Sequence, residues 1–389
     1  MNTSKYIIIG GGMTAASAVK GIREVDPTGT ITLFSEETHP PYNRPPLSKK
    51  LWKGGRVEDI WRTVDESVDM VMGRSIVQLD PRNKTVTDST GETYLYGKLL
   101  LATGGIPRIL PFGQDSILYY RTFNDYLMLQ DRVQKGGEFA IIGGGFIGSE
   151  LAAALCLNKQ PVTMVFPGNH IGERVFPLDL AQYVTDYYRD QGVEIKQGDQ
   201  LLGVEKYNGR LLLRLKSGND LIVDHVVAGI GIRPNIELAE AAGLAIDDGI
   251  MVDEYLQTNA SDVYAAGDVA AFYAPALEKR TRVEHEDNAN TMGRIAGRNM
   301  AGAKEAYDYL PMFYSDLFDL GYEAVGELNS ALETYADWQE PNKKGVVYYL
   351  NEGRVRGVLL WNVWDKVKQA RELIQSPEKF TKKELQGRL

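Results

Sequence analysis

Two segments of the chain repeat one pattern of hydrophobic and polar positions: a short apolar run, three glycines and then apolar residues at helical spacing. The glycine turns 10–12 and 143–145 lie 133 residues apart. Apolar runs of four or five residues bounded by turn signals predict buried strands. We expect strands at 6–9, 30–34, 139–142 and 162–166 and a helix at 15–25. Strands that alternate with helices predict an α/β fold with parallel sheets.

The rest of the chain predicts other kinds of structure. We expect β-meanders at about 68–98 and 193–227, a polar helix at 121–135, and, from about residue 311, aromatic-rich strands at 346–349 and 355–364 before a charged helical tail. The proline-rich segment 39–49 is expected to have no regular structure before Pro46. Two further apolar strands, ending near Gly104 and Asp268, finish in small residues, which leave room for a ligand.

Composition limits the classes of function. The 389 residues carry a net charge of −9, which disfavours a general nucleic-acid binder. No uncharged apolar run approaches ~18 residues, so we expect no membrane span. A single cysteine, Cys156, and a start without a signal-peptide pattern favour a cytoplasmic location. No cysteine or histidine cluster has metal-ligand spacing, so no metal site is expected.

The glycines have a specific physical purpose. In a strand–turn–helix unit the first allows a tight turn, the second lets the backbone approach a pyrophosphate, and a small residue at the sixth position keeps helix and strand close. The first turn supplies Gly10, Gly12 and Ala15, and the second supplies Gly143, Gly145 and Gly148. Two such sites predict two dinucleotides and electron transfer between them.

An acid after the second strand of such a unit binds the adenosine ribose. Glu36 stands there in the first unit, although its neighbour Glu37 is an alternative and a solvated acidic loop is another. In the second unit no acid stands at Pro167 or Gly168. His170 and Arg174 follow closely, either to meet a 2′-phosphate or to be solvated, and on balance we expect NADH, with NADPH left open.

Several motifs together resemble the two-dinucleotide-fold flavoprotein reductases, namely the two glycine turns, Ala102-Thr103-Gly104 and Ala265-Ala266-Gly267-Asp268. The segment Arg44-Pro45-Pro46-Leu47-Ser48-Lys49 is similar to the ferredoxin/rubredoxin reductase branch. Three later segments, 283–289, 293–300 and 357–362, most resemble apoptosis-inducing factor-like flavoproteins. The resemblance implies a discontinuous FAD domain (1–120 and 244–308), an inserted NAD(P)H domain (121–243) and a C-terminal α/β domain (309–389).

The resemblance also implies roles for individual residues. Those expected to hold FAD are Gly10, Gly12, Ala15, Glu36, Arg44, Lys49, Thr103, Gly104 and Asp268. Those expected to line the nicotinamide nucleotide site are Gly145, Phe146, Ile147, Gly231, Glu284, His285 and Tyr314. Tyr314 stands where the family usually has tryptophan, and Phe146 resembles an aromatic residue that shields the flavin.

Three residues are expected at the reacting centre. In the family Lys49 and Glu150 pair beside the flavin, where a fixed cation stabilises negative charge on the reduced ring. The alternative for Glu150 is an acid that complements a helix dipole. His285 resembles the histidine that packs near the nicotinamide, and the alternative is an ordinary loop histidine.

The chain departs from the disulfide reductases of this superfamily. Residues 10–60 contain no cysteine, and Cys156, between Leu155 and Leu157, is expected to be a small buried hydrophobe. Electrons must therefore leave the flavin for an external acceptor. Compared with apoptosis-inducing factor, no presequence and no long insertion before Val346 are recognised, so only the flavoprotein core of that family is expected here.

The predicted function is an FAD-dependent NADH oxidoreductase that passes electrons to a ferredoxin, rubredoxin or quinone. The alternative is a slow-turnover flavoprotein, similar to apoptosis-inducing factor, whose NADH-reduced state controls conformation, dimerisation or partner binding. A homodimer is an expectation from the family. Seven Lys or Arg against four Asp or Glu in residues 365–389 either meet an acidic acceptor or form a solvated helix.

Overall fold

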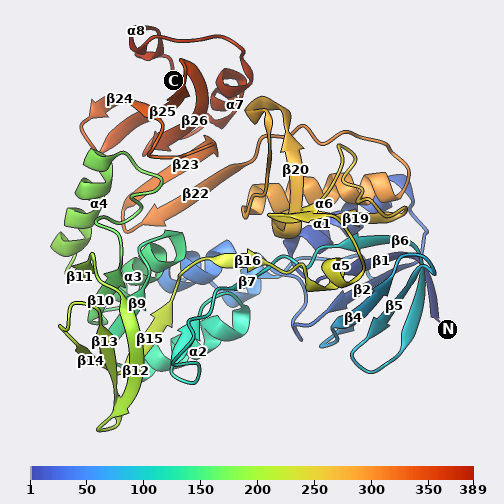
Figure 1. The fold of residues 1–389 in the computed structure, drawn as a ribbon, viewed down its shortest axis with the longest axis horizontal. Coiled ribbons are helices and arrows are strands. Elements are labelled where there is room, and N and C mark those ends of the chain that lie inside the picture. Colours follow the sequence, from blue (N-terminus) through green and yellow to red (C-terminus); the bar gives the residue numbers. More distant parts are fainter. Residues whose placement is uncertain (1) are drawn as a thin grey trace. The chain divides into compact units, whose positions relative to one another are not determined.

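The computed structural model describes residues 2–389, and the chain folds into two compact units (Figure 1). Of the described residues, the first unit comprises 2–43, 57–106 and 233–312. The second comprises residues 44–56, 107–232 and 313–389. The division groups the proline-rich segment with the second unit, and the three-domain boundaries expected above remain a prediction.

The first unit is built on a seven-stranded sheet with the order β3-β2-β1-β6-β5-β4, in which β19 also pairs with β6. Its strands are β1 (Asn2–Ile9), β2 (Ile31–Ser35), β3 (Asp69–Met72), β4 (Ile76–Asp80), β5 (Thr85–Asp88), β6 (Thr93–Leu101) and β19 (Val263–Ala265). β1 pairs in parallel with β2 and β6, so their carboxyl ends meet at one edge. The predicted α/β architecture is confirmed.

Helices α1 (Met13–Val25) and α6 (Glu286–Met300) pack closely in the first unit through small residues. A Cβ at Gly293 would stand 3.0 Å from the Cα of Thr14, and one at Gly297 would stand 2.8 Å from the carbonyl carbon of Ala18. Since no side chain separates the two backbones, α6 fixes the position of α1 and of the glycine turn before it.

Smaller elements complete the first unit. They are η3 (Val57–Ile60), α5 (Glu237–Ala241), β17 (Ile246–Asp247), β18 (Gly249–Met251), η4 (Gly267–Val269), β20 (Ala270–Ala274), η5 (Pro275–Leu277) and β21 (Lys279–Thr281). β7 (Gly105–Pro107) pairs with β16 (Ile232–Pro234) in a two-stranded sheet.

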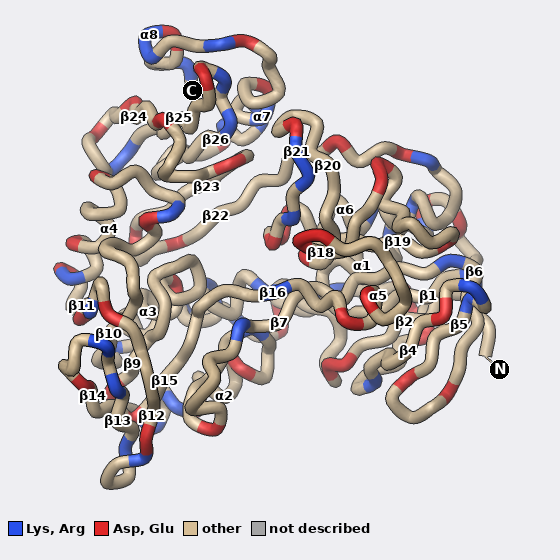
Figure 2. Tube along the Cα trace, viewed as in Figure 1, with Lys and Arg blue, Asp and Glu red and all other residues tan. Residues whose placement is uncertain are grey.

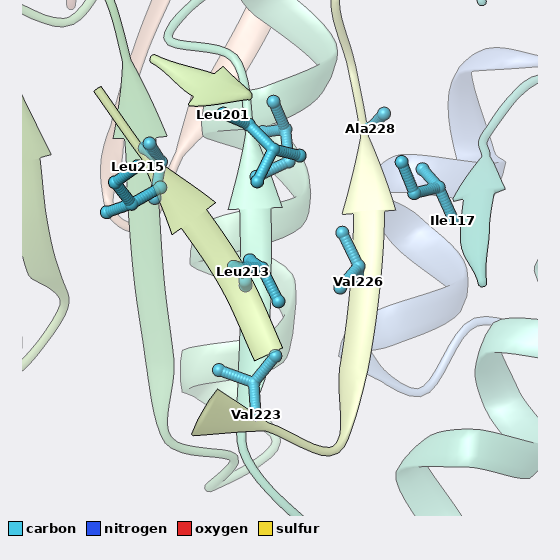
Figure 3. Close-up of a cluster of buried hydrophobic side chains, with 10 residues drawn as sticks. Ile117, Leu201, Leu213, Leu215, Val223, Val226 and Ala228 are labelled. Atoms are coloured by element: carbon cyan, nitrogen blue, oxygen red, sulfur yellow. The ribbon is translucent and has the colours of Figure 1, made fainter. Parts of the chain in front are cut away.

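The second unit contains a five-stranded parallel sheet with the order β11-β10-β9-β15-β8. Its strands are β8 (Ile117–Tyr119), β9 (Phe139–Ile142), β10 (Val162–Phe166), β11 (Glu194–Gln197) and β15 (His225–Ala228), and its helices are α2 (Phe123–Lys135), α3 (Phe146–Leu157) and α4 (Leu178–Asp190). One core cluster joins this sheet to the antiparallel strands β12 (Leu201–Tyr207), β13 (Arg210–Leu215) and β14 (Leu221–Val223). Figure 3 shows Leu213 and Val226 facing each other in this cluster.

The carboxyl-terminal part of the second unit is a five-stranded sheet with the order β22-β23-β26-β25-β24. Its elements are β22 (Met312–Leu317), β23 (Leu320–Gly326), β24 (Glu333–Glu340), β25 (Lys344–Asn351), β26 (Arg354–Trp361), α7 (Val367–Gln375) and α8 (Lys382–Leu385). The predicted aromatic-rich strands 346–349 and 355–364 correspond to β25 and β26, although β26 ends at Trp361. Figure 2 shows basic and acidic residues interspersed around α7 and α8.

The structure corrects three expectations. β3 and β11 are parallel edge strands of the two main sheets, so neither belongs to a meander. Within the two ranges predicted as meanders, the antiparallel strands are β4–β6 and β12–β14. The proline-rich segment becomes regular one residue before Pro46, because Pro45 begins the 3₁₀ helix η1 (Pro45–Ser48), which is followed by η2 (Lys50–Lys53).

Candidate functional site: two glycine turns and a buried ion pair

The first glycine turn has the geometry that a pyrophosphate requires. Gly10 has a φ of +121°, and a Cβ there would stand 2.7 Å from the carbonyl carbon of Ala102 at the end of β6. Only glycine fits this position. A Cβ at Gly12 would meet no atom within 4 Å, so the space beside the start of α1 is open. Gly12 caps α1 without a side-chain hydrogen bond, which leaves first-turn N–H groups for an anion.

The second turn reproduces this geometry in the second unit. Gly143 has a φ of +118°, and a Cβ there would stand 3.0 Å from the carbonyl carbon of Gly229. A Cβ at Gly145 would meet no atom within 4 Å, and Gly145 caps α3 without a side-chain hydrogen bond. At Gly148 a Cβ would stand 2.9 Å from the carbonyl carbon of Gly143. In each turn a side chain is excluded at the first glycine and the space beside the third glycine is open, so the backbone fits a dinucleotide phosphate.

Other residues expected at the first turn surround it in the first unit. Glu36 directly follows β2 and is exposed, whereas Glu37 accepts a 2.7 Å hydrogen bond from the Tyr42 hydroxyl. The carboxylate of Glu36 is therefore the one that remains accessible at the end of this strand. Ala15 is fully buried in α1, as a residue that spaces helix from sheet should be.

The strands that end in small residues form the same edge of the first sheet. The Thr103 hydroxyl donates to the Asn235 carbonyl at 2.8 Å, and the Asn235 amide donates to the carbonyl of Gly104, whose φ is +64°. Asp268 lies in η4, which begins two residues after the end of β19. A Cβ at Gly267 would stand 3.1 Å from the Cβ of Thr14 in α1, so this edge is tightly packed against the glycine turn.

His285 is the N-terminal capping residue of α6, and its side chain makes no capping hydrogen bond to that helix. Burial lowers the pKa of the imidazole to about 4, against the opposing charge of Asp268. The ring is therefore neutral at physiological pH. Its neighbour Glu284 is exposed and accepts a 2.6 Å hydrogen bond from Arg282.

Lys49 and Glu150 form a buried ion pair in the second unit. Lys49 Nζ lies 2.7 Å from Glu150 Oε1, and the two side chains are 11% and 3% exposed. Glu150 is in the first turns of α3, so proximity to the helix N-terminus also favours its negative charge. The ion pair and the helix-dipole interaction are therefore both present, and they are not exclusive alternatives.

Two serines complete the coordination of the Glu150 carboxylate. Ser48 donates to Oε2 at 2.5 Å, and Ser315, from β22, donates to Oε1 at 2.6 Å. Both serines are buried. This role of Ser48 and Ser315 was not predicted from the sequence. Ser48 directly precedes Lys49, which was a usable signal, but Ser315 is brought in only by the tertiary fold.

The surroundings of the pair are aromatic. Burial, and secondarily the charge of Glu150, raise the pKa of Tyr188 and of Tyr322 well above the usual value. Lys49 Nζ also lies 5.3 Å from the centre of the Tyr314 ring. The low-dielectric environment strengthens every electrostatic interaction of the pair.

Phe146 and Ile147 begin α3 directly after the open glycine turn, and each is 38% exposed, as is Tyr314. The Phe146 ring packs 5.4 Å from that of Phe313, centre to centre. These apolar side chains are accessible next to the second turn, where a flat aromatic ligand can stack on them.

Two other expected residues are held by backbone contacts of the second unit. Arg44 donates from Nη1 to the Arg121 carbonyl at 2.9 Å. Gly231 has a φ of +91°, and its carbonyl accepts from the Arg108 amide. The residues of the first glycine turn lie in the first unit, and those around the ion pair lie in the second. Among the residues expected to hold FAD, Arg44 and Lys49 therefore belong to the second unit.

Cys156 differs from its expected environment. It is only partly buried, and its Sγ lies 3.1 Å from the Gln191 carbonyl, so it is not a fully buried hydrophobe. Burial nevertheless raises the pKa of the thiol, which lowers its reactivity.

None of the helices within residues 2–389 combines the length and the apolar character needed to cross a membrane.

Comparisons with known proteins agree with this geometry. A family model described as pyridine nucleotide-disulphide oxidoreductase matches residues 4–293. A second, described as apoptosis-inducing factor, mitochondrion-associated, C-term, matches residues 296–343 and 336–376.

Individual relatives match nearly the whole chain. Apoptosis-inducing factor 1, mitochondrial, of Dictyostelium discoideum is 36% identical, over 95% of this chain and 78% of its own length. Monodehydroascorbate reductase 4, peroxisomal, of Arabidopsis thaliana is 33% identical, over 91% and 78%.

Among solved structures, the reductase–putidaredoxin covalent complex contains a chain with a TM-score of 0.90 and 28% identity, with 96% of this chain and 94% of that chain covered. The extent of these matches, together with two glycine turns that fit dinucleotide phosphates, shows that the chain belongs to the pyridine nucleotide-disulphide oxidoreductase family and is an FAD- and NAD(P)H-dependent oxidoreductase.

Proposed function

We propose that the protein oxidises NADH with FAD and passes the electrons to a separate ferredoxin-type iron–sulfur protein. The observation that carries the proposal is the pair of open glycine turns in a chain with a single cysteine. Two turns accommodate two dinucleotides, whereas one cysteine cannot form the redox dithiol of a disulfide reductase. The electrons must therefore leave for another molecule.

Each turn is assigned one ligand. FAD would be held by Gly10, Gly12, Ala15, Glu36, Arg44, Lys49, Thr103, Gly104 and Asp268. The nicotinamide nucleotide would be held by Gly145, Phe146, Ile147, Gly231, Glu284, His285 and Tyr314. The accessible carboxylate of Glu36 supports the first assignment, and the exposed apolar side chains beside Gly145 support the second.

Bound FAD would supply the redox chemistry, since a flavin accepts a hydride and can release electrons singly. Lys49 supplies a fixed positive charge that favours negative charge on a nearby ring. Glu150 and its two serine donors hold Lys49 in one position. His285 is neutral, so it can pack beside a nicotinamide without repelling the positive charge of the oxidised form.

The acceptor is proposed from chemistry and from relatives. The reductase matched among solved structures was solved in complex with putidaredoxin, which supports a protein acceptor. Each NADH supplies two electrons, so two one-electron acceptors should be reduced per NADH oxidised. The cytoplasm, as a reducing compartment, is the location that we propose.

Stopped-flow mixing of the FAD-loaded protein with NADH under nitrogen tests the proposal, with the flavin absorbance followed. Ferredoxin, a soluble quinone and a dye are then added separately. Fast flavin reduction followed by fast reoxidation with two ferredoxins reduced per NADH supports the proposal. Reduced flavin that persists for minutes with every acceptor contradicts it.

A second candidate function is favoured by the match of residues 296–376 to the apoptosis-inducing factor C-terminal model. In that case NADH reduction controls assembly or partner binding, and turnover is slow. Sedimentation of the FAD-loaded protein with and without NADH separates the two. A monomer that becomes a homodimer on reduction, with slow reoxidation, supports the second function, and an unchanged mass with fast turnover supports the first.

A further inference from the structure

An acidic side chain lies beside the end of strand β10 in the second unit, although it does not directly follow this strand in the sequence. The strand runs to Phe166 and is followed by Pro167 and Gly168, so no carboxylate stands at the usual ribose-binding position. A Cβ at Gly168 would nevertheless stand 2.6 Å from the carboxyl carbon of Glu173. The carboxylate of Glu173 therefore fills the space that the side chain of residue 168 would occupy.

The orientation of this carboxylate is fixed on one side only. Oε2 of Glu173 accepts hydrogen bonds from the amides of Asn169 at 2.7 Å and of His170 at 3.3 Å. Oε1 accepts no hydrogen bond from any residue between 2 and 389, and the side chain is only partly buried. One oxygen thus anchors the group, and the other is available to accept from a ligand hydroxyl.

Backbone contacts hold this turn against the glycine turn that precedes α3. The Gly172 amide donates to the Gly144 carbonyl at 2.9 Å. Ser330 donates from its hydroxyl to the Glu173 carbonyl at 2.6 Å and from its amide to the Arg174 carbonyl at 3.0 Å. Glu173 is therefore held at a defined place beside the site of the second dinucleotide.

We propose that Glu173 replaces the missing acid at the end of β10, binds the 2′-hydroxyl of the adenosine ribose and makes the enzyme selective for NADH over NADPH. The inference rests on the proposed binding of a nicotinamide nucleotide at the second turn. A ribose hydroxyl can donate to Oε1, whereas a 2′-phosphate would place its negative charge against the carboxylate. Arg174, which could have favoured a 2′-phosphate, is exposed next to Glu173.

Calorimetric titration of the FAD-loaded protein with NAD⁺ and with NADP⁺ measures this selectivity without turnover. We expect NAD⁺ to bind at least about tenfold more tightly, and Glu173→Gln to reduce the ratio by about tenfold or more, because a charge-assisted hydrogen bond and a repulsion are both lost. The matched control is Glu194→Gln, which removes the same charge from the exposed start of the neighbouring strand β11 and should leave the ratio unchanged.

A transplanted acid provides the second test. Gly168 does not have a positive φ, so it tolerates a side chain once Glu173 is shortened. The Glu173→Ala variant should lose selectivity, and the Gly168→Asp/Glu173→Ala double variant should regain it. Restoration supports recognition by a carboxylate at this place and excludes a general loss of folding as the cause.

Three results would overturn the inference: a wild-type protein that binds NADP⁺ as tightly as NAD⁺, an unchanged ratio in Glu173→Gln, or an equal loss of affinity for both nucleotides, which would mean that Glu173 only supports the turn. Failure of the proposed function looks different. In that case neither nucleotide binds the wild-type protein, and NADH does not reduce its flavin.

Discussion

The Ser315 hydroxyl donates a 2.6 Å hydrogen bond to Glu150 Oε1, although the two residues are 165 positions apart in the chain. Ser315 comes from β22 of the carboxyl-terminal sheet and Glu150 from α3 of the second dinucleotide fold. The same oxygen contacts Lys49. Three distant segments thus meet at one buried carboxylate.

Removal of the Ser315 hydroxyl should weaken the fold of the second unit. Ser315→Ala leaves the carboxylate with one donor fewer in a buried site, so we expect a loss of roughly 1.5–3 kcal/mol in the free energy of unfolding. Urea unfolding followed by tryptophan fluorescence measures it. Ser261→Ala, at an exposed position, is the control and should have no effect. Equal effects of the two substitutions would contradict the importance of this hydrogen bond.

Lys49 and Glu150 should show strong energetic coupling. Glu150→Leu leaves the Lys49 ammonium largely buried without its partner, and we expect a destabilisation of about 3–5 kcal/mol. The Lys49→Met/Glu150→Leu double variant should recover part of this loss because no charge stays buried. A double-mutant cycle measured by urea unfolding provides the coupling energy. Additive effects of the two single substitutions would show that the pair does not interact.

Substitutions at Gly10 and Gly12 should separate folding from FAD binding. Gly10→Ala introduces a Cβ at a positive φ into contact with the backbone of Ala102, so we expect a poorly folded protein. Gly12→Ala meets no protein atom, and we expect a normally folded protein that retains little FAD. Circular dichroism measures folding, and absorbance near the flavin bands measures the cofactor content.

Gly145 is the residue of the second turn that corresponds to Gly12, and an added Cβ there also meets no atom within 4 Å. Gly145→Ala should fold and retain FAD but bind NAD⁺ more weakly. If Gly12→Ala retained full FAD content, or if Gly145→Ala lost it, the assignment of the two turns would have to be exchanged or abandoned.

His285 should make stability depend on pH. Burial lowers the pKa of this histidine to about 4 in the folded protein, whereas an unfolded histidine titrates near 6.5. The unfolded chain therefore binds the proton more readily, so stability should decrease as pH falls from about 6.5 to about 4 and change no further below that range through this group. The His285→Gln variant should show a shallower decrease.

Proton NMR provides the direct measurement, since the chain has only four histidines. The imidazole resonance that disappears in His285→Gln should not titrate between pH 8 and about pH 5. A resonance that titrates near pH 6.5 would contradict the neutral state of the half-buried His285.

Much of the architecture could be predicted from local patterns. A strand–glycine–helix unit depends on residues close together in the chain, because the turn requires a positive φ at Gly10 and at Gly143. Both strand–glycine–helix segments were therefore predicted correctly, and β10 was predicted with its observed bounds, Val162–Phe166. The partners of β3 and β11 were predicted incorrectly, since alternation along a strand does not identify the strand beside it.

The sequence by itself determined the two dinucleotide folds and the lack of a second cysteine, because each depends on residue identity or on short-range spacing. Only the tertiary structure decided which groups surround Glu150 and which acid stands at the end of β10. Ser315 reaches Glu150 from another sheet, and Glu173 reaches Gly168 because the following turn folds back. Hydrogen bonds and packing between distant segments determine both arrangements, and no local pattern encodes them.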